Sequence, residues 1–376
     1  MSTLASNREY YYGQTSAPPM AGVIGYFIAI LDAFLVNGFN PRNVTSLTVS
    51  NNVATATTST AHGYEIGTVI ANSGANESVF NDDFEIIAIP TTTSFTFAVT
   101  TALTAATGTI TCKVAPLGWE KTFSGTNKAV YRSLDLTTNQ FYLRVDDTNA
   151  QYAAVTMYET MSNVDTGTGA SATKYWKKSS TSDTTARPWY AIGNKKVFYI
   201  FAEWYSIYTL QAAAYVFGWF PSLKSGDGYN TMLIGHDASA PYNASYNINF
   251  TKIGSVTGNE GQVIARSYTQ IGGYISFYKL AGIGGHIDMG YLSTFPFPNA
   301  TDNGVHLFPI YIYEYSVNVF RGKMPGLYAP NEHTNGIFYS RDKTVIINNN
   351  RYICYRLAVG ANVVGNCWFT LDEEWT

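Results

Sequence analysis

Six short runs of β-forming residues between positions 44 and 114 decide how this chain is interpreted. The first is Val44-Thr-Ser-Leu-Thr-Val-Ser50, which turns at Asn51-Asn52 and returns as Val53-Ala-Thr-Ala-Thr57. Thr, Val, Ile and Phe alternate along all six runs, a pattern typical of half-buried strands. The other four runs, each bounded by turn residues, are 69–71, 84–89, 94–99 and 108–114. We therefore expect a small all-β module over residues 43–115, set inside a larger protein.

The composition favours a β-rich structural protein that is covered by neighbouring subunits. Of 376 residues, 13% are charged and 15% are aromatic, including 29 Tyr and 21 Phe. The core of a protein–protein interface is similarly depleted of charge and enriched in aromatic residues. The alternative is a robust β protein that works as a monomer. A net charge of −3 gives no basic footprint for nucleic acid, so we expect no nucleic-acid partner.

The first 42 residues combine a polar arm with an apolar helix. The arm, residues 1–19, contains Tyr10-Tyr11-Tyr12, and such arms are often ordered only against a neighbour. Residues 20–37 are apolar with helical spacing, ended by Asn37-Gly38. Asp32 and two glycines interrupt this run, which predicts a buried helix rather than a membrane span. The candidates for an interface here are Tyr10, Tyr11, Tyr12, Phe27 and Leu31.

Residues 116–376 are expected to form a β-sandwich-like main domain, to which the arm and helix (1–42) also belong. Short β runs alternate with hairpin signals such as Asn303-Gly304. The predicted fold class is therefore mainly β, with one N-terminal helix. The segment from Arg321 to Tyr328 contains Pro325-Gly326, which fits a type II turn. We expect Arg321 to pair bidentately with a buried carboxylate or with carbonyl groups, and we regard Arg321 and Tyr328 as candidates for a contact with a neighbour.

The residues offer little catalytic chemistry, and we expect no enzyme, metal or cofactor. Adjacent acids such as Asp146-Asp147 face opposite sides of a strand, so they would not converge across a sugar as a glycoside hydrolase requires. The most metal-like spacings are His236-Asp237 and His286-Ile-Asp288, each with too few ligands. Three cysteines do not make a disulfide framework. We expect them to be reduced, although Cys354 and Cys367 could pair.

Exposed aromatic residues could stack on a host-surface glycan. Trp189, Trp204 and Trp219, each beside another aromatic residue, are the candidate platforms. Packing in the core or in a subunit interface accounts for the same residues. Both interpretations remain open at the level of sequence.

Part of the chain resembles a known module. The residues Ala61-His-Gly-Tyr64, Gly67, Phe80-Asn81 and the run 93–99 are similar to a small β-barrel repeat of phage tail and virion proteins. That repeat is named for its likeness to the first catalytic cysteine half-domain of ubiquitin-activating enzymes. The resemblance implies that residues 43–115 form a compact β-barrel used as a spacer or decoration, and it implies no ubiquitin chemistry.

The remainder resembles uncharacterised virion proteins of tailed bacteriophages and prophages. The motifs that carry this likeness are Leu31-Asp-Ala-Phe-Leu-Val-Asn-Gly-Phe39, Gly118-Trp-Glu-Lys-Thr-Phe-Ser-Gly125, Tyr142-Leu-Arg-Val-Asp-Asp147, Ala186-Arg-Pro-Trp189 and Arg321-Gly-Lys-Met-Pro-Gly326. The resemblance implies a virion structural protein that assembles with itself and other virion proteins. It also implies that residues 43–115 are an insertion into a surface loop between the helix and the first core strand. It favours the tail, in the baseplate or fibre-attachment region, with capsid decoration or the neck as the alternative.

Overall fold

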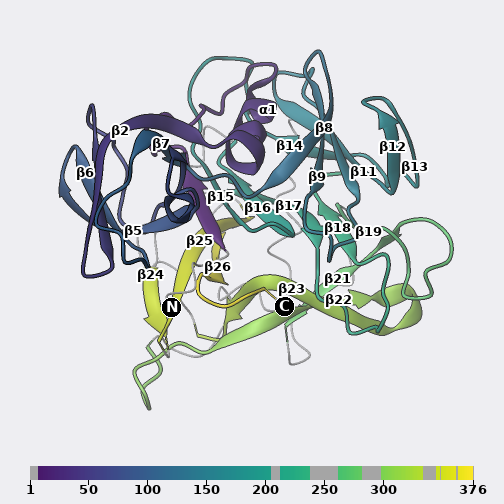
Figure 1. Cartoon of the computed structure of the whole chain (residues 1–376). Helices are drawn as coiled ribbons and strands as arrows, with labels where there is room; N and C mark the ends of the chain where they lie inside the picture. The colour runs from purple at the N-terminus through teal and green to yellow at the C-terminus, as the bar shows by residue number, and fades with distance from the viewer. Residues whose placement is uncertain are drawn as a thin grey trace.

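The described part of the chain forms three large antiparallel sheets, a two-stranded sheet and a closed barrel (Figure 1). The computed structural model describes residues 7–204, 212–237, 261–281, 298–332, 344–347, 349–360 and 363–375. Within this part the chain is mainly β, which confirms the predicted fold class. Among the described residues, helical structure is confined to α1 (Tyr26–Leu31), the π-helix η1 (Asp32–Asn37) and the 3-10 turns η2 (Ser78–Phe80) and η3 (Tyr315–Val317).

The three sheets are defined by their strand order. The central sheet has the order β1 (Arg8–Tyr11), β15 (Trp189–Gly193), β16 (Val197–Ala202), β17 (Ala213–Trp219), β18 (Thr231–Ile234), β19 (Gln262–Ile264), β20 (Ile275–Ser276). The second sheet has the order β14 (Lys174–Lys177), β11 (Tyr152–Tyr158), β10 (Tyr142–Asp146), β9 (Lys128–Ser133), β8 (Trp119–Gly125). The C-terminal sheet has the order β21 (Tyr278–Ala281), β22 (Leu307–Glu314), β23 (Val319–Pro330), β26 (Val363–Thr370), β25 (Asn350–Gly360), β24 (Thr344–Ile347). A separate two-stranded sheet is formed by β12 (Thr160–Asn163) and β13 (Thr166–Thr168).

Strand β16 shows that the central sheet is buried on both faces. Its sequence is apolar at every position, and all six side chains are buried. On one face, the Phe198 ring lies 5.3 Å from the ring of Trp119 in the second sheet. On the other face, the Tyr199 ring lies 4.7 Å from the ring of Phe369 in the C-terminal sheet. A strand buried on both faces has a continuous apolar run instead of alternation, so the two-layer sandwich expected from the sequence has a third layer.

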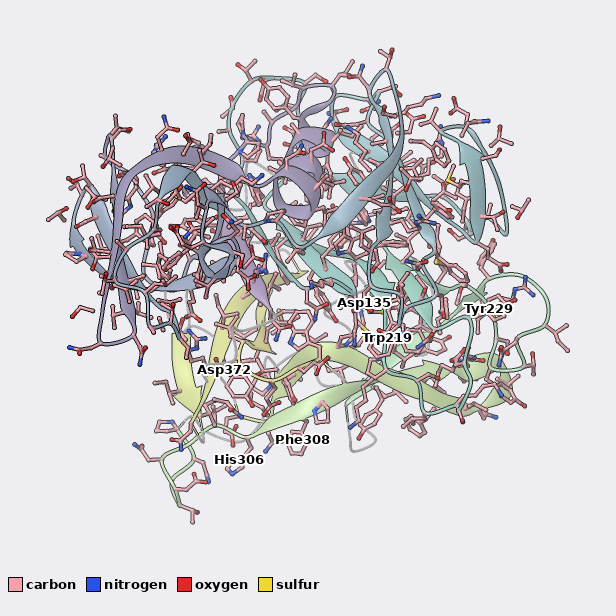
Figure 2. The ribbon with its side chains drawn as sticks, in the orientation of Figure 1. Asp135, Trp219, Tyr229, His306, Phe308 and Asp372 are labelled. Atoms are coloured by element: carbon pink, nitrogen blue, oxygen red, sulfur yellow. The ribbon has the colours of Figure 1, made fainter. Side chains whose placement is uncertain are left out.

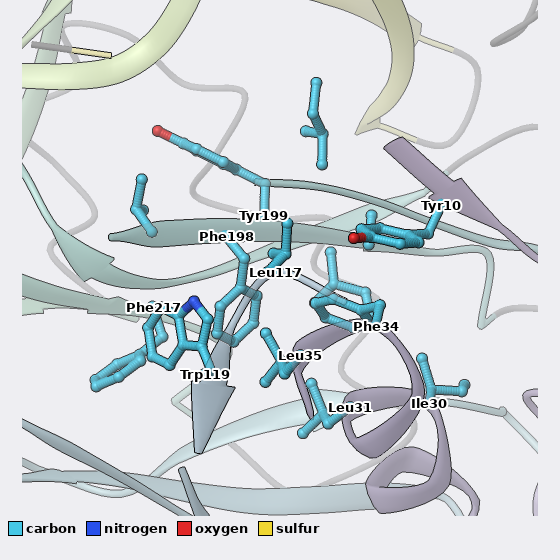
Figure 3. Close-up of a cluster of buried hydrophobic side chains, with 14 of the residues drawn as sticks. Tyr10, Ile30, Leu31, Phe34, Leu35, Leu117, Trp119, Phe198, Tyr199 and Phe217 are labelled. Carbon is cyan, nitrogen blue, oxygen red and sulfur yellow. The ribbon is translucent and has the colours of Figure 1, made fainter. Parts of the chain in front are cut away.

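The apolar helix packs in this core, beside the second sheet (Figure 3). The helical run predicted for residues 20–37 begins only at Tyr26, and its second half is a π-helix. The ring of Phe34 lies 5.5 Å from that of Phe198, and Leu31 is fully buried. Ile24, which precedes the helix, is 47% exposed, so it does not belong to the buried apolar side of this segment.

A buried ion pair holds the beginning of this helix in place. Lys178, which follows β14, pairs with Asp147, which follows β10, and both side chains are fully buried. The Asp147 carboxylate also accepts hydrogen bonds from the backbone N–H groups of Phe27 (2.8 Å) and Ile28 (3.2 Å). The Lys178 ammonium donates to the carbonyl of Val23 (2.7 Å). Burial raises the pKa of Asp147 to about 6, although the Lys178 charge opposes the shift.

The barrel closes on itself in the order β2 (Phe39–Ser50), β3 (Val53–Thr58), β6 (Ser94–Ala98), β5 (Asp83–Thr91), β4 (Val69–Ala75), β7 (Gly108–Val114). All six runs predicted from the sequence are therefore strands. Figure 1 shows the barrel at one side of the layered body. The chain enters and leaves it at one place, because Phe39 and Val114 are ladder partners. Gly38 has φ +68°, and a Cβ there would lie 2.3 Å from the Val114 carbonyl oxygen, so the entry point requires glycine.

Polar contacts join the barrel to the body. Arg8 of β1 pairs with Asp83, and Arg351 of β25 pairs with Glu85. The hydroxyl of Tyr10 donates to the carbonyl of Ala115 (2.7 Å). The barrel shares no ladder with the three sheets in the part of the chain that the structure describes.

Deletion of the barrel should leave a folded body. Ladder partners lie about 5 Å apart, so a short Gly-Ser linker can replace residues 41–113. Arg8 keeps its hydrogen bond to Pro116, and Arg351 keeps Asp372, so neither guanidinium loses all its partners. We expect a β-type circular dichroism spectrum and one cooperative unfolding transition. A molten or precipitating product would contradict the insertion hypothesis.

Loss of both members of the buried pair should cost less than the two single losses added together. Lys178→Met leaves Asp147 buried without its cation and should lower the free energy of unfolding by about 3–5 kcal/mol. The double variant Lys178→Met with Asp147→Leu removes both charges, and it should be less destabilised than the sum of the single variants. Denaturant titration measures all three. Additive effects would show that the pair is not coupled.

Candidate functional site

The structure places most of the predicted interface residues inside the chain. Strand β1 pairs with β15 of the same chain, with Tyr10 opposite Ala191, so residues 8–11 of the arm form part of the chain's own central sheet. Tyr10 is 1% exposed, and Tyr11 is also buried. Their prediction as interface residues is corrected to a role inside the chain. The Tyr10 ring packs against those of Phe34 (5.6 Å) and Phe39 (6.3 Å), and the Tyr11 hydroxyl donates to Glu65 of the barrel segment. Tyr12 differs, being 46% exposed.

The helix residues receive the same correction. Phe27 and Leu31 are fully buried between the second and central sheets, so they offer no surface to a partner. The Phe27 ring packs against that of Trp176 (5.6 Å) in β14. The helical spacing correctly predicted that Phe27 and Leu31 are buried. Other parts of the same chain cover them.

The tryptophans predicted as sugar platforms are largely buried. Trp189 has no exposed surface, and its indole N–H donates to the carbonyl of Pro18 (2.9 Å). Trp204 is also buried, with the Lys177 ammonium 4.6 Å from its ring centroid. Trp219 is half-buried, with Lys196 5.0 Å from its ring. A sugar cannot stack on Trp189 or Trp204, so these two predictions are corrected to core packing.

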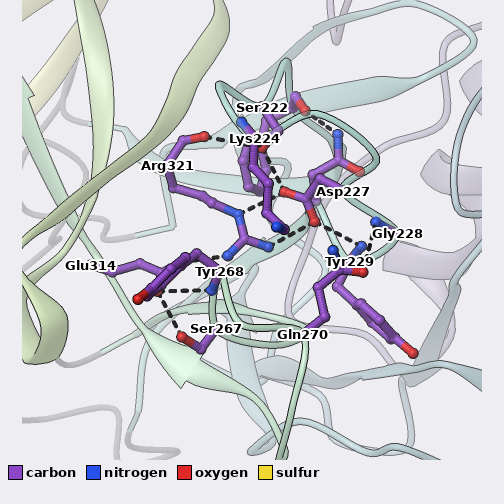
Figure 4. Close-up of polar contacts among 12 residues, drawn as sticks. Ser222, Lys224, Asp227, Gly228, Tyr229, Ser267, Tyr268, Gln270, Glu314 and Arg321 are labelled. Atoms are coloured by element: carbon purple, nitrogen blue, oxygen red, sulfur yellow. Dashed lines mark hydrogen bonds and ion pairs between the residues drawn. The ribbon is translucent and has the colours of Figure 1, made fainter.

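Arg321 lies at the centre of a fully buried ionic cluster (Figure 4). Its guanidinium binds both carboxylate oxygens of Asp227, with Nε–Oδ2 2.6 Å and Nη2–Oδ1 2.8 Å. Its Nη1 donates to Oε1 of Glu314 (2.6 Å). This bidentate contact confirms the predicted pairing with a buried carboxylate. Because Arg321 is 1% exposed, its predicted contact with a neighbour is corrected to an internal one.

The remaining oxygens of this cluster are satisfied by two loops. The other oxygen of Glu314 accepts from the hydroxyl of Ser267 and the backbone N–H of Tyr268, both at 3.0 Å. Asp227 accepts from the hydroxyl of Ser222 (2.6 Å) and the N–H of Tyr229 (3.0 Å). The cluster therefore fixes both loops and the β22–β23 hairpin relative to each other. Sequence reasoning missed Asp227 and Glu314, because neither stands in a recognisable motif.

The outer face of the β22–β23 hairpin carries aromatic side chains. The ladder pairs Tyr311 with Lys323, Tyr313 with Phe320, and Pro309 with Tyr328, which places these residues on one face. We call this set of six the ribbon face. Phe308 and His306 lie at the start of β22, along the lower edge of the molecule in Figure 2. Tyr328, the last predicted interface residue, is half-buried on this face and contacts the Tyr352 ring at 5.8 Å.

A polar cavity of about 400 Å³ lies between the arm, the barrel and the C-terminal sheet. Its carboxylates are already engaged. Glu85 pairs with Arg351, Glu65 accepts a hydrogen bond from the Tyr11 hydroxyl, and Glu9 accepts from the Tyr355 hydroxyl (3.1 Å). This arrangement gives the cavity a structural lining and no candidate acid–base pair.

The adjacent acids diverge as the strand geometry predicts. Asp147 points into the core, whereas Asp146 faces the surface, where it accepts from Thr148 and pairs with Arg144. Burial opposes the shift at Asp146, but the hydrogen bonds from Thr148 and the charges of Arg144 and Lys128 outweigh it and lower the pKa of this carboxyl. Burial raises the pKa of Asp147, so the pKa values of the two carboxyls move in opposite directions. They do not form the convergent pair that sugar hydrolysis needs.

Within the described residues, no group of three His, Cys, Asp or Glu side chains could hold a metal ion. His286 and Asp288 lie outside those residues. The three cysteines are free and buried, and burial raises the pKa of the Cys112 thiol to about 11. In the described part of the chain, no helix is both long enough and apolar enough to cross a membrane.

Comparisons with known proteins add little. No family model and no curated protein sequence matches the chain. Among solved structures it is similar to the endosialidase of phage phi92, at 11% identity and a TM-score of 0.18, over 88% of this chain and 52% of that chain. The chain thus spans about half the length of that endosialidase. A TM-score this low carries no argument about fold or activity.

Replacement of Arg321 by Lys should destabilise the protein by about 2–3 kcal/mol, because an ammonium cannot bind Asp227 bidentately while reaching Glu314. The matched control is Arg132→Lys, at a partly exposed pair with Glu120, where we expect a change within about 1 kcal/mol. Both values come from urea unfolding followed by tryptophan fluorescence. Equal effects at the two positions would contradict the assigned role of the cluster.

Proposed function

We propose that this chain is a non-enzymatic structural subunit of a tailed-bacteriophage virion. It assembles with copies of itself and with other virion proteins. Within the particle we place it in the tail, in the baseplate or fibre-attachment region. Capsid decoration or the neck is the alternative location.

The observation that carries this proposal is the closed barrel at residues 39–114. The motifs around Ala61-His-Gly-Tyr64 resemble a small barrel repeat of phage tail and virion proteins, and the segment that bears them does close into a barrel. It joins the body through one entry and exit point, as a spacer or decoration does.

The described chemistry supports a structural role. The carboxylates Asp227, Glu314 and Asp147 are buried in ion pairs that hold loops and layers together. The Glu85 carboxylate in the cavity is likewise paired with a guanidinium. These acids are thus committed to the fold, which favours a subunit built for rigidity over a hydrolase.

The test is the protein content of purified phage particles. We expect the chain to be recovered by mass spectrometry at a stoichiometric ratio to the tail proteins, and gold-labelled antibody to mark the tail in electron micrographs. Absence from density-purified particles would overturn the virion assignment. Label confined to the head would replace the tail location by the alternative.

A further inference from the structure

We infer that the ribbon face is a contact surface between two copies of this chain. Along β22, the side chains of the ribbon face alternate with buried side chains, so the strand has a distinct inner and outer side. Ile310, Ile312 and Glu314 are all fully buried on the inner side. Tyr311 and Tyr313 therefore point outward, and both are partly exposed.

The hairpin turn beside this face exposes more apolar surface than a solvated turn requires. Tyr315 and Phe320 are each 52% exposed, and Val317 is 41% exposed. The Phe320 ring contacts those of Tyr313 (5.3 Å) and Tyr311 (5.8 Å), so these rings form one continuous patch. An aromatic side chain half-exposed in this way offers roughly 100 Å². The patch therefore amounts to several hundred Å², the range in which exposed apolar patches are often functional.

The patch is held rigidly from below. Arg321 follows Phe320 directly, and its buried cluster ties the hairpin to the loops at 222–229 and 267–268. The turn itself is fixed by the Tyr313 hydroxyl, which donates to the side chain of Asn318 (2.8 Å). Asn318 has φ +55°, a conformation that asparagine tolerates. A patch already held in one conformation loses little entropy on binding.

Charge and area favour a second copy as the occupant. Lys323 carries the one charge among the six side chains of the ribbon face, and its ammonium lies 5.7 Å from the Tyr311 ring centroid. A two-fold contact would place Lys323 of each copy near the tyrosine rings of the other, which gives self-complementary cation–π pairs. A stable contact needs about 800 Å² per partner, of which about 65% at the core is apolar. The patch supplies an apolar core of that order.

The proposed function includes self-assembly, and this inference rests on that part of it. The inference adds the surface through which two copies meet. The inference and the proposed function can fail separately. A chain absent from phage particles could still dimerise through the ribbon face when purified. A chain present in particles could be monomeric in solution, which would overturn the contact and leave the virion role intact.

The experiment is sedimentation velocity of the purified full chain over a wide concentration range. We expect a monomer–dimer equilibrium. Phe320→Asp and Tyr315→Asp should each raise the dimer dissociation constant by roughly 30-fold or more, because each removes a central aromatic anchor. The control is Leu103→Asp, at a barrel position that is 43% exposed, and it should leave the constant unchanged.

Thermal unfolding of each variant shows whether it is folded. Two independent hairpin variants keep the test decisive if one of them fails to fold. A wild-type chain that stays monomeric at every concentration would overturn the inference. This holds even where another protein or a saccharide covers the ribbon face. A dimer that persists in both hairpin variants, or that Leu103→Asp weakens equally, would also overturn it.

Discussion

The buried pair between Asp147 and Lys178 is the contact on which the layered body depends. It joins the end of β10 to the segment after β14, and both to the start of the helix. The helix needs this support, because Gly25 at its N-terminus has φ +82° and provides no side-chain cap. Asp147 takes over that role by accepting the N–H groups of Phe27 and Ile28. Removal of two charges from water is costly, so the pair contributes position more than stability.

Once the helix is placed, the central sheet can be buried on both faces. The helix and the second sheet cover Phe198, and the C-terminal sheet covers Tyr199. The barrel lies outside this stack and is attached by ion pairs and by the Tyr10–Ala115 hydrogen bond. A unit attached in this way can carry its own role without disturbing the layers.

The second ionic cluster repeats this principle at the other end of the molecule. Arg321 fixes the hairpin whose outer side carries the ribbon face, while Asp227 and Glu314 bring in the supporting loops. The charged groups of this cluster are thus buried, and the aromatic rings of the ribbon face lie on the surface above them. The low overall charge of the chain fits this division, since many of its ionic groups serve the fold. A rigid, nearly uncharged aromatic face is suited to permanent contact with a neighbour.

The sequence by itself determined what depends on neighbouring residues along the chain. The alternation from Val44 to Val114 predicted all six barrel strands, and helical spacing predicted the burial of Phe27 and Leu31. The tertiary structure alone decided which partners cover these elements. Arg321 meets a carboxylate 94 positions away, and the tyrosine arm pairs with β15 of its own chain instead of a neighbour. Side-chain alternation is a local property of the backbone, whereas the partner of a charge or an edge strand depends on the path of the whole chain.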